Sequence, residues 1–211
     1  MTALVIARAP GDPAALAGLA PLLDADRRTA FQALLIRRAA AWAAAAAPGA
    51  AHVAVASAGQ ADAVAALLPP GVTALPVDDG SAPGGILAAA VLRIGRGPLL
   101  IAGTGCARLG PAHAAAALSD LAAGCDVVFG ATLEGGWYLA GLREPRADLL
   151  TVAPDAGQRS AGLGPVLQRA RELHAEVGML RHERVLDAPG DVAALLADPL
   201  LAPELRAALS A

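Results

Sequence analysis

Lysine is absent from this sequence, and all 16 of its basic residues are arginine. Mechanisms that need a lysine, such as Schiff-base chemistry or a phosphate-binding loop that ends in Gly-Lys, are therefore excluded. Arginine has to neutralise any phosphate that the protein binds.

Several other features are scarce, and each scarcity excludes a class of protein. Two cysteines, Cys106 and Cys125, are too few for a disulfide framework. The formal net charge is −3 and no basic stripe is present, so we expect no nucleic-acid partner. No apolar run reaches the roughly 18 residues of a membrane span. The first apolar run is broken by Arg8 and Pro10, too early for a signal peptide, so we expect a cytoplasmic protein.

Aromatic residues make up only 2% of the chain, although 56% of it is hydrophobic. The core must therefore consist mainly of alanine, leucine and valine packed closely together. A length of 211 residues suffices for one sizeable core. We expect a single domain over residues 1–211.

Short apolar runs alternate with helical patterns along the first two thirds of the chain. We expect strands at 3–7, 52–57, 72–77, 99–102 and 126–130, and helices at 24–47, 61–68, 86–94 and 112–123. This alternation predicts a mostly parallel sheet with helices on both faces. The run at 137–142 follows the previous strand too closely for a helical crossover, which indicates an antiparallel, hairpin-like strand.

The last third of the chain is less regular in its pattern. We expect irregular structure at 148–160, a helix at 163–174 and short strands at 177–180 and 185–186. Two further helices should end near 196 and 209. The charged residues 181–184 fall between the two short strands, where a solvated turn is a more common explanation than acid–base chemistry.

A buried strand at 99–102 runs into Gly103, Thr104 and Gly105, and Pro111 opens the next helix. Such a strand–turn–helix junction is a typical ligand site in α/β proteins. A dinucleotide fingerprint is a weak interpretation, because its third glycine would fall on Arg108. Cys106 is either a thiolate activated by the helix N-terminus or a small buried thiol, and the second explanation is the simpler one.

Glu134 is the most distinctive carboxylate in the chain. It precedes Gly135 and Gly136, and the aromatic residues Trp137 and Tyr138 follow. Glu134 could accept a proton or bind a cation, while the aromatic rings stack on a sugar or base. The alternative is a turn glutamate whose aromatic neighbours cover the core, and the pattern favours neither.

Four segments together resemble a known family: ALVIARAP, PLLIAGTGCARL, VVFGATLEGGWYLAGLREP and VLDAPGDVAAL. The resemblance is to a bacterial glycosyltransferase-like family linked with arsenosugar biosynthesis, related to molybdenum-cofactor guanylyltransferases. It implies a Rossmann-like nucleotide-diphospho-sugar transferase (GT-A) fold. The third segment is the most specific, and it matches at Gly135, Gly136, Tyr138, Leu139, Gly141 and Leu142.

Several charged positions of that family are changed in this chain. Leu16 and Gly18 stand at its lysine and arginine, and Gly105 stands at its metal-binding aspartate. Val185 replaces the first aspartate of its late motif, whereas Glu134 and Asp187 keep a carboxylate. Uncharged residues 82–87 replace an acidic and arginine-containing loop. The family scaffold is retained and much of its charge is lost.

The resemblance implies a nucleotide or nucleotide-sugar ligand and a bound Mg²⁺ or Mn²⁺ ion, unless the site binds no metal. Glu134 is the expected catalytic residue, and Glu134 with Asp187 are the expected metal ligands. The expected binding residues are Arg8, Ala9, Pro10, Gly11, Thr104, Gly105, Cys106, Gly135, Gly136 and Trp137. The alternative is a catalytically inactive relative that acts through a protein partner or as a homo-oligomer.

Overall fold

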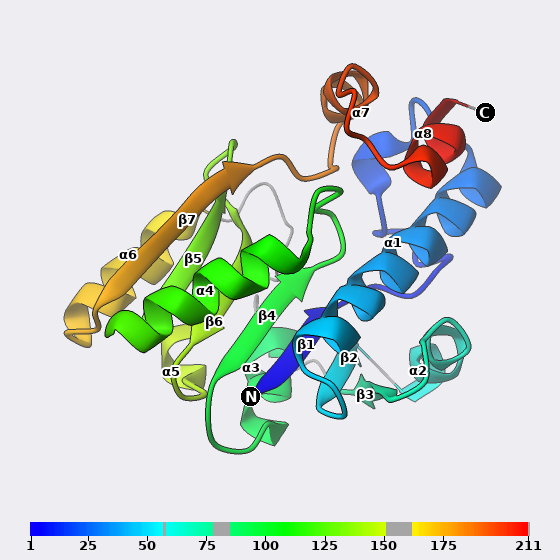
Figure 1. Ribbon diagram of the computed structural model, residues 1–211. Coiled ribbons are helices and arrows are strands. Elements are labelled where there is room, and N and C mark those ends of the chain that lie inside the picture. The colour runs from blue at the N-terminus through cyan, green and yellow to red at the C-terminus, as the bar shows by residue number, and fades with distance from the viewer. Residues whose placement is uncertain (57, 78–84, 151–161, 211) are drawn as a thin grey trace.

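The structure is a computed structural model, and it describes residues 1–56, 58–77, 85–150 and 162–210. Its described strands form one seven-stranded sheet in the order β3-β2-β1-β4-β6-β5-β7 (Figure 1). The strands are β1 (Thr2–Ile6), β2 (Ala51–Val55), β3 (Val72–Pro76), β4 (Leu99–Gly103), β5 (Val127–Thr132), β6 (Trp137–Leu142) and β7 (Val177–Glu183).

Strand directions agree with the alternation in the sequence. Only β6 runs antiparallel to its neighbours, β4 and β5, while every other strand pair in the described sheet is parallel. The five strands that the alternating pattern predicts, β1 to β5, are thus confirmed. The antiparallel strand expected after Gly130 is confirmed as β6. A hairpin inserted into a parallel sheet brings β6 between β4 and β5.

Helices cover both faces of this sheet (Figure 1). They are α1 (Ala25–Ala46), α2 (Ala58–Ala65), α3 (Gly85–Arg93), α4 (Pro111–Ala123), α5 (Ala147–Leu150), α6 (Leu163–Glu172), α7 (Pro189–Leu196) and α8 (Pro203–Ser210), with a short 3₁₀ turn η1 (Ala17–Leu19). Buried residues of α1, α2 and α4 share one core cluster, and those of α3, α5 and α6 share the cluster on the other face.

Strand β4 lies in the middle of the sheet and is buried on both faces, as its sequence predicts. Leu100 and Ala102 pack into the α1–α4 side, whereas Leu99 and Ile101 pack into the opposite side. Alternate side chains of a strand point to opposite faces, which explains this division. Alanine does much of the packing, because Ala39, Ala40 and Ala43 let α1 approach the sheet closely.

A third apolar cluster lies beyond the carboxyl ends of the central strands. Its buried side chains come from η1, the first half of α1, the β4–α4 loop, α7 and α8. Arg38 on α1 forms an ion pair with Glu204 on α8, and Arg108 lies 3.4 Å from Asp198. The C-terminal helices are therefore held against the edge of the sheet where the parallel strands end.

Some element boundaries differ from those that the sequence predicts. Helix α2 begins three residues early, and α6 ends at Glu172 because His174 adopts a left-handed φ of 53°. The region expected to be irregular contains α5, while residues 151–160 lie outside the described residues. Val185 does not form part of a strand of its own, since it makes a single β-bridge with Cys106.

The interpretation of residues 181–184 as a solvated turn is wrong. Residues 181–183 end strand β7, and Glu183 is only 7% exposed. The pairing with β5 advances from Gly130/Leu180 to Thr132/Glu183, so β7 contains one extra residue there. This β-bulge changes the face to which Glu183 points, which a strict alternation of polar and apolar residues does not anticipate.

None of the helices in the described part of the chain combines the length and the apolar character that crossing a membrane requires.

Candidate functional site

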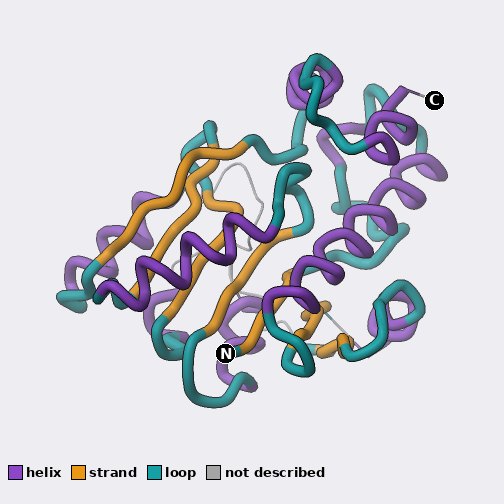
Figure 2. The backbone as a smooth tube through the Cα atoms, in the orientation of Figure 1, coloured by secondary structure: helices purple, strands orange, loops and turns teal. Residues whose placement is uncertain are grey.

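The carboxyl ends of β1, β4, β5 and β7 lie at the same edge of the sheet, which we call the carboxyl edge. The loops that follow these strands gather there (Figure 2). In open α/β sheets this edge is where ligands bind. Most of the site residues expected from the sequence are in these loops.

Glu134, Arg184 and Asp191 form a connected group at this edge, although they come from three different segments. Nη1 of Arg184 lies 3.5 Å from Oε1 of Glu134 and 2.9 Å from Oδ1 of Asp191. The Arg184 side chain is 33% exposed, and that of Glu134 is 20% exposed. The sequence pattern predicts a role for Glu134 but not for its two partners. Arg184 is 50 residues and Asp191 is 57 residues away from Glu134 in the chain, so no local pattern links them.

The β5–β6 turn determines the position of Glu134. Gly135 has a φ of +86°, a conformation that only glycine adopts freely. The Gly136 N–H donates to Oγ1 of Thr132 at 2.8 Å, and the Thr132 N–H donates to the Gly136 carbonyl at 2.9 Å. The turn is therefore closed by two hydrogen bonds that leave the Glu134 side chain out of the sheet.

One carboxylate oxygen of Glu134 has no hydrogen-bond partner among the described residues. This atom, Oε2, is shielded from solvent, and no donor in the described part of the chain reaches it. A buried acceptor without a partner costs free energy, on the order of 1–3 kcal/mol. A ligand at the carboxyl edge could therefore interact with Oε2 through a hydrogen-bond donor or a cation.

Asp191 is the anchor of this group. It is almost fully buried in the first turn of α7, and its Oδ2 accepts the N–H groups of Asp187 at 3.1 Å and Ala188 at 2.8 Å. These bonds cap the helix and fix the preceding segment, which carries Arg184. Asp191 therefore couples the start of α7 to the orientation of Arg184.

The loop after β4 lies beside the segment that joins β7 to α7. The Leu186 N–H donates to the Gly105 carbonyl at 2.9 Å, and Cys106 forms an isolated antiparallel β-bridge with Val185. Thr104 and Gly105 are half-buried, whereas Cys106 is buried. Burial raises the pKa of the Cys106 thiol to about 12, which contradicts an activated thiolate and agrees with the small buried thiol.

The β1 loop contributes Arg8, Ala9, Pro10 and Gly11 to this edge. Arg8 pairs with Asp12 at 3.8 Å, and the Gln32 amide donates to the Arg8 carbonyl at 2.9 Å. Gly11 and Asp12 line a cavity of about 50 Å³ with residues of α1. In the described part of the chain no contact joins Arg8 to Glu134.

Trp137 and Tyr138 are in the core and do not face the carboxyl edge. Their rings are 1% and 0% exposed, and Trp137 packs edge-on against Phe129. Tyr138 covers Gly130 and donates to the carbonyl of Arg181 at 3.1 Å. The interpretation in which the aromatic residues cover the core is thus the one that the structure supports.

His113, Glu183 and Arg181 form a second polar group that the sequence did not reveal. The Gly110 N–H donates to Nδ1 of His113 at 3.1 Å, and Nε2 of the same ring lies 3.2 Å from Oε1 of Glu183 and 3.2 Å from Nη2 of Arg181. Nε of Arg181 lies 2.8 Å from the same oxygen of Glu183. His113 and Glu183 are 70 residues apart in the sequence, so no local pattern links them.

Glu134 and Asp187, the expected metal ligands, are only two carboxylates. Among the described residues, no group of three or more His, Cys, Asp or Glu side chains is placed to hold a metal ion. The carboxylate of Glu134 already pairs with Arg184, and Asp187 takes part through its N–H. Since a guanidinium cation lies within the group, the described residues do not fit a divalent ion beside Glu134.

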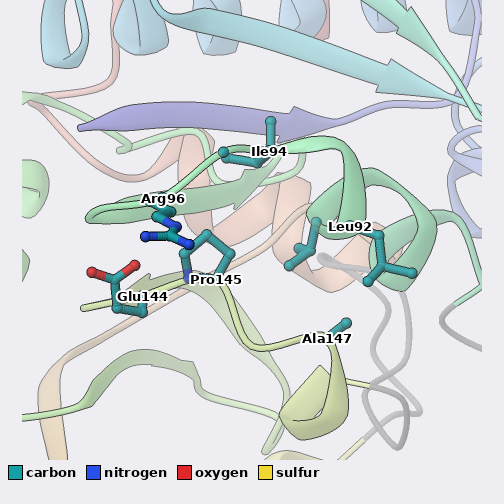
Figure 3. Close-up of a pocket in the computed structure, with 8 residues that line it drawn as sticks. Leu92, Ile94, Arg96, Glu144, Pro145 and Ala147 are labelled. Carbon is teal, nitrogen blue, oxygen red and sulfur yellow. The ribbon is translucent and has the colours of Figure 1, made fainter.

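A larger cavity lies at the opposite edge of the sheet (Figure 3). It has a volume of about 300 Å³ and is lined by residues of the α3–β4 and β6–α5 connections, among them Ile94, Arg96, Glu144 and Pro145. Glu144 accepts the Gly97 N–H at 2.8 Å. None of the expected site residues lines this cavity.

Solved structures with similar folds define the class of this protein. A protein of Desulfovibrio desulfuricans G20, provisionally described as a nucleotide-diphospho-sugar transferase, has a TM-score of 0.81 at 18% identity; the match covers 100% of this chain and 95% of that one. CMP:2-keto-3-deoxy-manno-octonic acid synthetase in complex with CTP has a TM-score of 0.56 at 13% identity, over 93% and 96% of the two chains.

Molybdopterin-guanine dinucleotide biosynthesis protein A of Archaeoglobus fulgidus matches with a TM-score of 0.53 at 16% identity, over 100% of this chain and 97% of that one. The fold is therefore that of the nucleotide-diphospho-sugar transferases, GT-A-like, as the resemblance implied. Within this fold class the chain belongs to DUF2064, described as an uncharacterized protein conserved in bacteria, whose model matches residues 39–154. No curated protein matches the sequence.

One structural neighbour contains a divalent metal ion. Rv0371c of Mycobacterium tuberculosis H37Rv, in complex with manganese, has a TM-score of 0.54 at 16% identity, over 92% of this chain and 97% of that one. The identities in all these matches are low, so they establish the fold and leave the ligand and the reaction of this chain to its own residues.

Proposed function

We propose that this protein binds a nucleoside diphosphate or a nucleotide sugar at the carboxyl edge and acts in glycosyl or nucleotidyl transfer. The observation that carries the proposal is Glu134, whose Oε2 has no partner and whose Oε1 lies 3.5 Å from Arg184. Ligands of open α/β sheets bind at this edge. A fold neighbour in complex with CTP supports a nucleotide in particular.

In this proposal Glu134 is the general base. Its Oε2 accepts the proton of an attacking hydroxyl group, whose oxygen bonds to the anomeric carbon or the phosphorus of the donor. The bond to the leaving phosphate oxygen breaks, and arginine neutralises the charge that develops there. Residues 8–11, residues 104–106, Gly135 and Gly136 line the nucleotide site.

The alternative is a relative of the same fold that binds its ligand without turnover. The packing of Gly18 favours this alternative, because a side chain there would overlap the carbonyl oxygen of Asp187. The arginine that the resembled family has at this position does not fit without movement of the segment. Turnover that disappears in Glu134→Gln would contradict the alternative.

Calorimetric titration tests the proposal. ADP, CDP, GDP and UDP and their sugar derivatives are titrated into the protein, with and without Mg²⁺ or Mn²⁺, and nucleotide sugars are then assayed for turnover. We expect at least one nucleotide to bind, and Glu134→Gln to lower turnover about 100-fold or more.

Glu144→Gln is the matched control, since Glu144 lies at the opposite edge of the sheet. We expect it to leave both nucleotide binding and turnover unchanged. The absence of binding for the whole panel, with and without metal, would overturn the proposed function.

A further inference from the structure

We infer that Arg184 is a built-in cation of the carboxyl edge, which takes the place of a divalent metal ion between two carboxylates and binds the ligand's phosphate groups directly. The binding of phosphate by Arg184 rests on the proposed function. The replacement of a metal ion by Arg184 is independent of the proposed function, because it depends only on the residues of the carboxyl edge.

The position of Arg184 is that of a bridging cation. A single nitrogen, Nη1, contacts Oε1 of Glu134 at 3.5 Å and Oδ1 of Asp191 at 2.9 Å. The two carboxylates come from different elements, the β5–β6 turn and α7. A divalent ion typically joins carboxylates from separate segments in this way.

The remaining donors of Arg184 are available to a ligand. Within the described residues, Nε and Nη2 make no hydrogen bond, and a third of the side chain is open to solvent. Among the described residues, three other arginines near this edge already contact a carboxylate: Arg8 contacts Asp12, Arg108 contacts Asp198, and Arg181 contacts Glu183. A guanidinium group presents two parallel N–H donors that match the geometry of a phosphate group.

The carboxylates around Arg184 orient it without cancelling its charge entirely. Asp191 also accepts two backbone N–H groups at the start of α7, where the helix dipole is positive. Asp191 therefore interacts with the helix terminus as well as with Arg184. A third of the Arg184 side chain remains open to solvent.

Glu134 and Gly105 fit the same arrangement. A metal ion bound to Oε2 of Glu134 would be repelled by the nearby guanidinium group of Arg184. A neutral hydroxyl group of a ligand, bound at the same oxygen, would not be repelled. A Cβ added to Gly105 would lie 3.7 Å from Val185, next to Arg184 in the chain. The position at which the resembled family has its metal-binding aspartate thus adjoins the segment that carries the arginine.

Manganese titration, followed by the paramagnetic resonance signal of free Mn²⁺, tests the inference without any nucleotide. We expect wild-type protein to bind Mn²⁺ no more tightly than about 1 mM. We expect Arg184→Met, which removes the guanidinium group from between Glu134 and Asp191, to raise the affinity about tenfold or more. Adding Glu134→Gln to that variant should remove the gain, and Arg108→Met should produce none.

Inorganic pyrophosphate, titrated in excess EDTA, is the second probe. We expect wild-type protein to bind it and Arg184→Met to bind about ten times more weakly, with Arg108→Met unchanged. Tight Mn²⁺ binding by wild-type protein that Glu134→Gln abolishes would overturn the inference. So would a folded Arg184→Met variant that gains no Mn²⁺ affinity, or one that binds pyrophosphate as wild type does.

If Arg184→Met does not fold, the wild-type Mn²⁺ titration and its Glu134→Gln control still decide the matter. The Mn²⁺ titration contains no nucleotide, so its result does not depend on the proposed function. If no nucleotide binds, that result counts against the proposed function and not against the displacement of the metal ion.

Discussion

Asp191 shows how one side chain can serve both the fold and the site. It closes the start of α7 through two backbone N–H groups and holds Arg184 through its other oxygen. Both roles require a buried carboxylate, and the residue is 1% exposed. No local sequence pattern links Asp191 to Arg184, which lies seven residues earlier in the chain.

We expect Asp191→Ala to lower the free energy of unfolding by about 2–4 kcal/mol, because two buried N–H groups and Arg184 lose their acceptor. Urea denaturation of the variant measures this loss. Asp26→Ala, at an exposed position in the first turn of α1, should cost about 0.5 kcal/mol at most. Equal effects of the two substitutions would mean that Asp191 is no anchor.

Cys106 supplies a prediction about pH. Burial raises the pKa of its thiol from the ordinary 9.0 to about 12, and burial also raises the pKa of Tyr138. A pKa that is higher in the folded state stabilises the fold fully below the unfolded value. That contribution is lost as the pH rises from 9.0 through about 12.

We therefore expect the free energy of unfolding to fall between these two pH values, and to fall less in Cys106→Ser. In a Cys125→Ser background, Cys106 should resist iodoacetamide at pH 8 until the protein is unfolded with urea. Rapid modification of the folded protein would show that Cys106 is a reactive thiolate after all.

At the scale of elements, the 3₁₀ turn η1 packs against the segment before α7 so closely that only glycine fits at position 18. A Cβ at Gly18 would overlap the carbonyl oxygen of Asp187, whereas nothing lies within 4 Å of one at Gly95. Any side chain at this position would therefore require the two segments to separate.

We expect Gly18→Ala to destabilise the protein by about 1–3 kcal/mol, the usual range for overpacking. Thermal unfolding, with Gly95→Ala as the matched control, measures the difference. A Gly18→Ala variant as stable as the control would show that the two segments separate easily.

The sequence anticipates the elements better than it anticipates their contacts. Alternating apolar runs predict the parallel strands, and the short interval after Gly130 predicts the antiparallel β6, because both signals are local. The pairing of His113 with Glu183 is not local: 70 residues separate them. A β-bulge also turns Glu183 to the other face of β7, so strand periodicity could not place it.

The candidate site follows the same pattern. Glu134 stands out because glycines and aromatic residues surround it, and these are neighbours in sequence. Arg184 has no such context, and the charged residues around it indicated a solvated turn. Trp137 was ambiguous, since an aromatic residue after a glycine turn is equally suited to a ligand and to the core.

At the scale of the whole molecule, two core clusters build the sheet layers, and a third attaches the C-terminal helices to the carboxyl edge. The family match covers residues 39–154, which include Gly105 and Glu134, whereas Arg184 and Asp191 lie after its last residue. The candidate site therefore contains residues inside and outside the matched range.

We expect Leu205→Ala to lower the free energy of unfolding by about 2–5 kcal/mol, because this side chain is at the centre of the third cluster. Leu205 is 0% exposed, whereas Leu200 in the same region is 76% exposed, so Leu200→Ala should change stability little. Urea denaturation compares the two variants. Equal stability would mean that α8 is not part of the cooperative fold.

We propose that the carboxyl edge binds a nucleotide through Arg184 without a divalent ion. Calorimetric titration of ADP, CDP, GDP and UDP in excess EDTA, into wild-type protein and into Arg184→Met, tests this binding mode. We expect at least one of these nucleotides to bind wild-type protein, and to bind the variant about ten times more weakly or worse. Binding that requires Mg²⁺ or Mn²⁺, or that is equal in the two proteins, would contradict it.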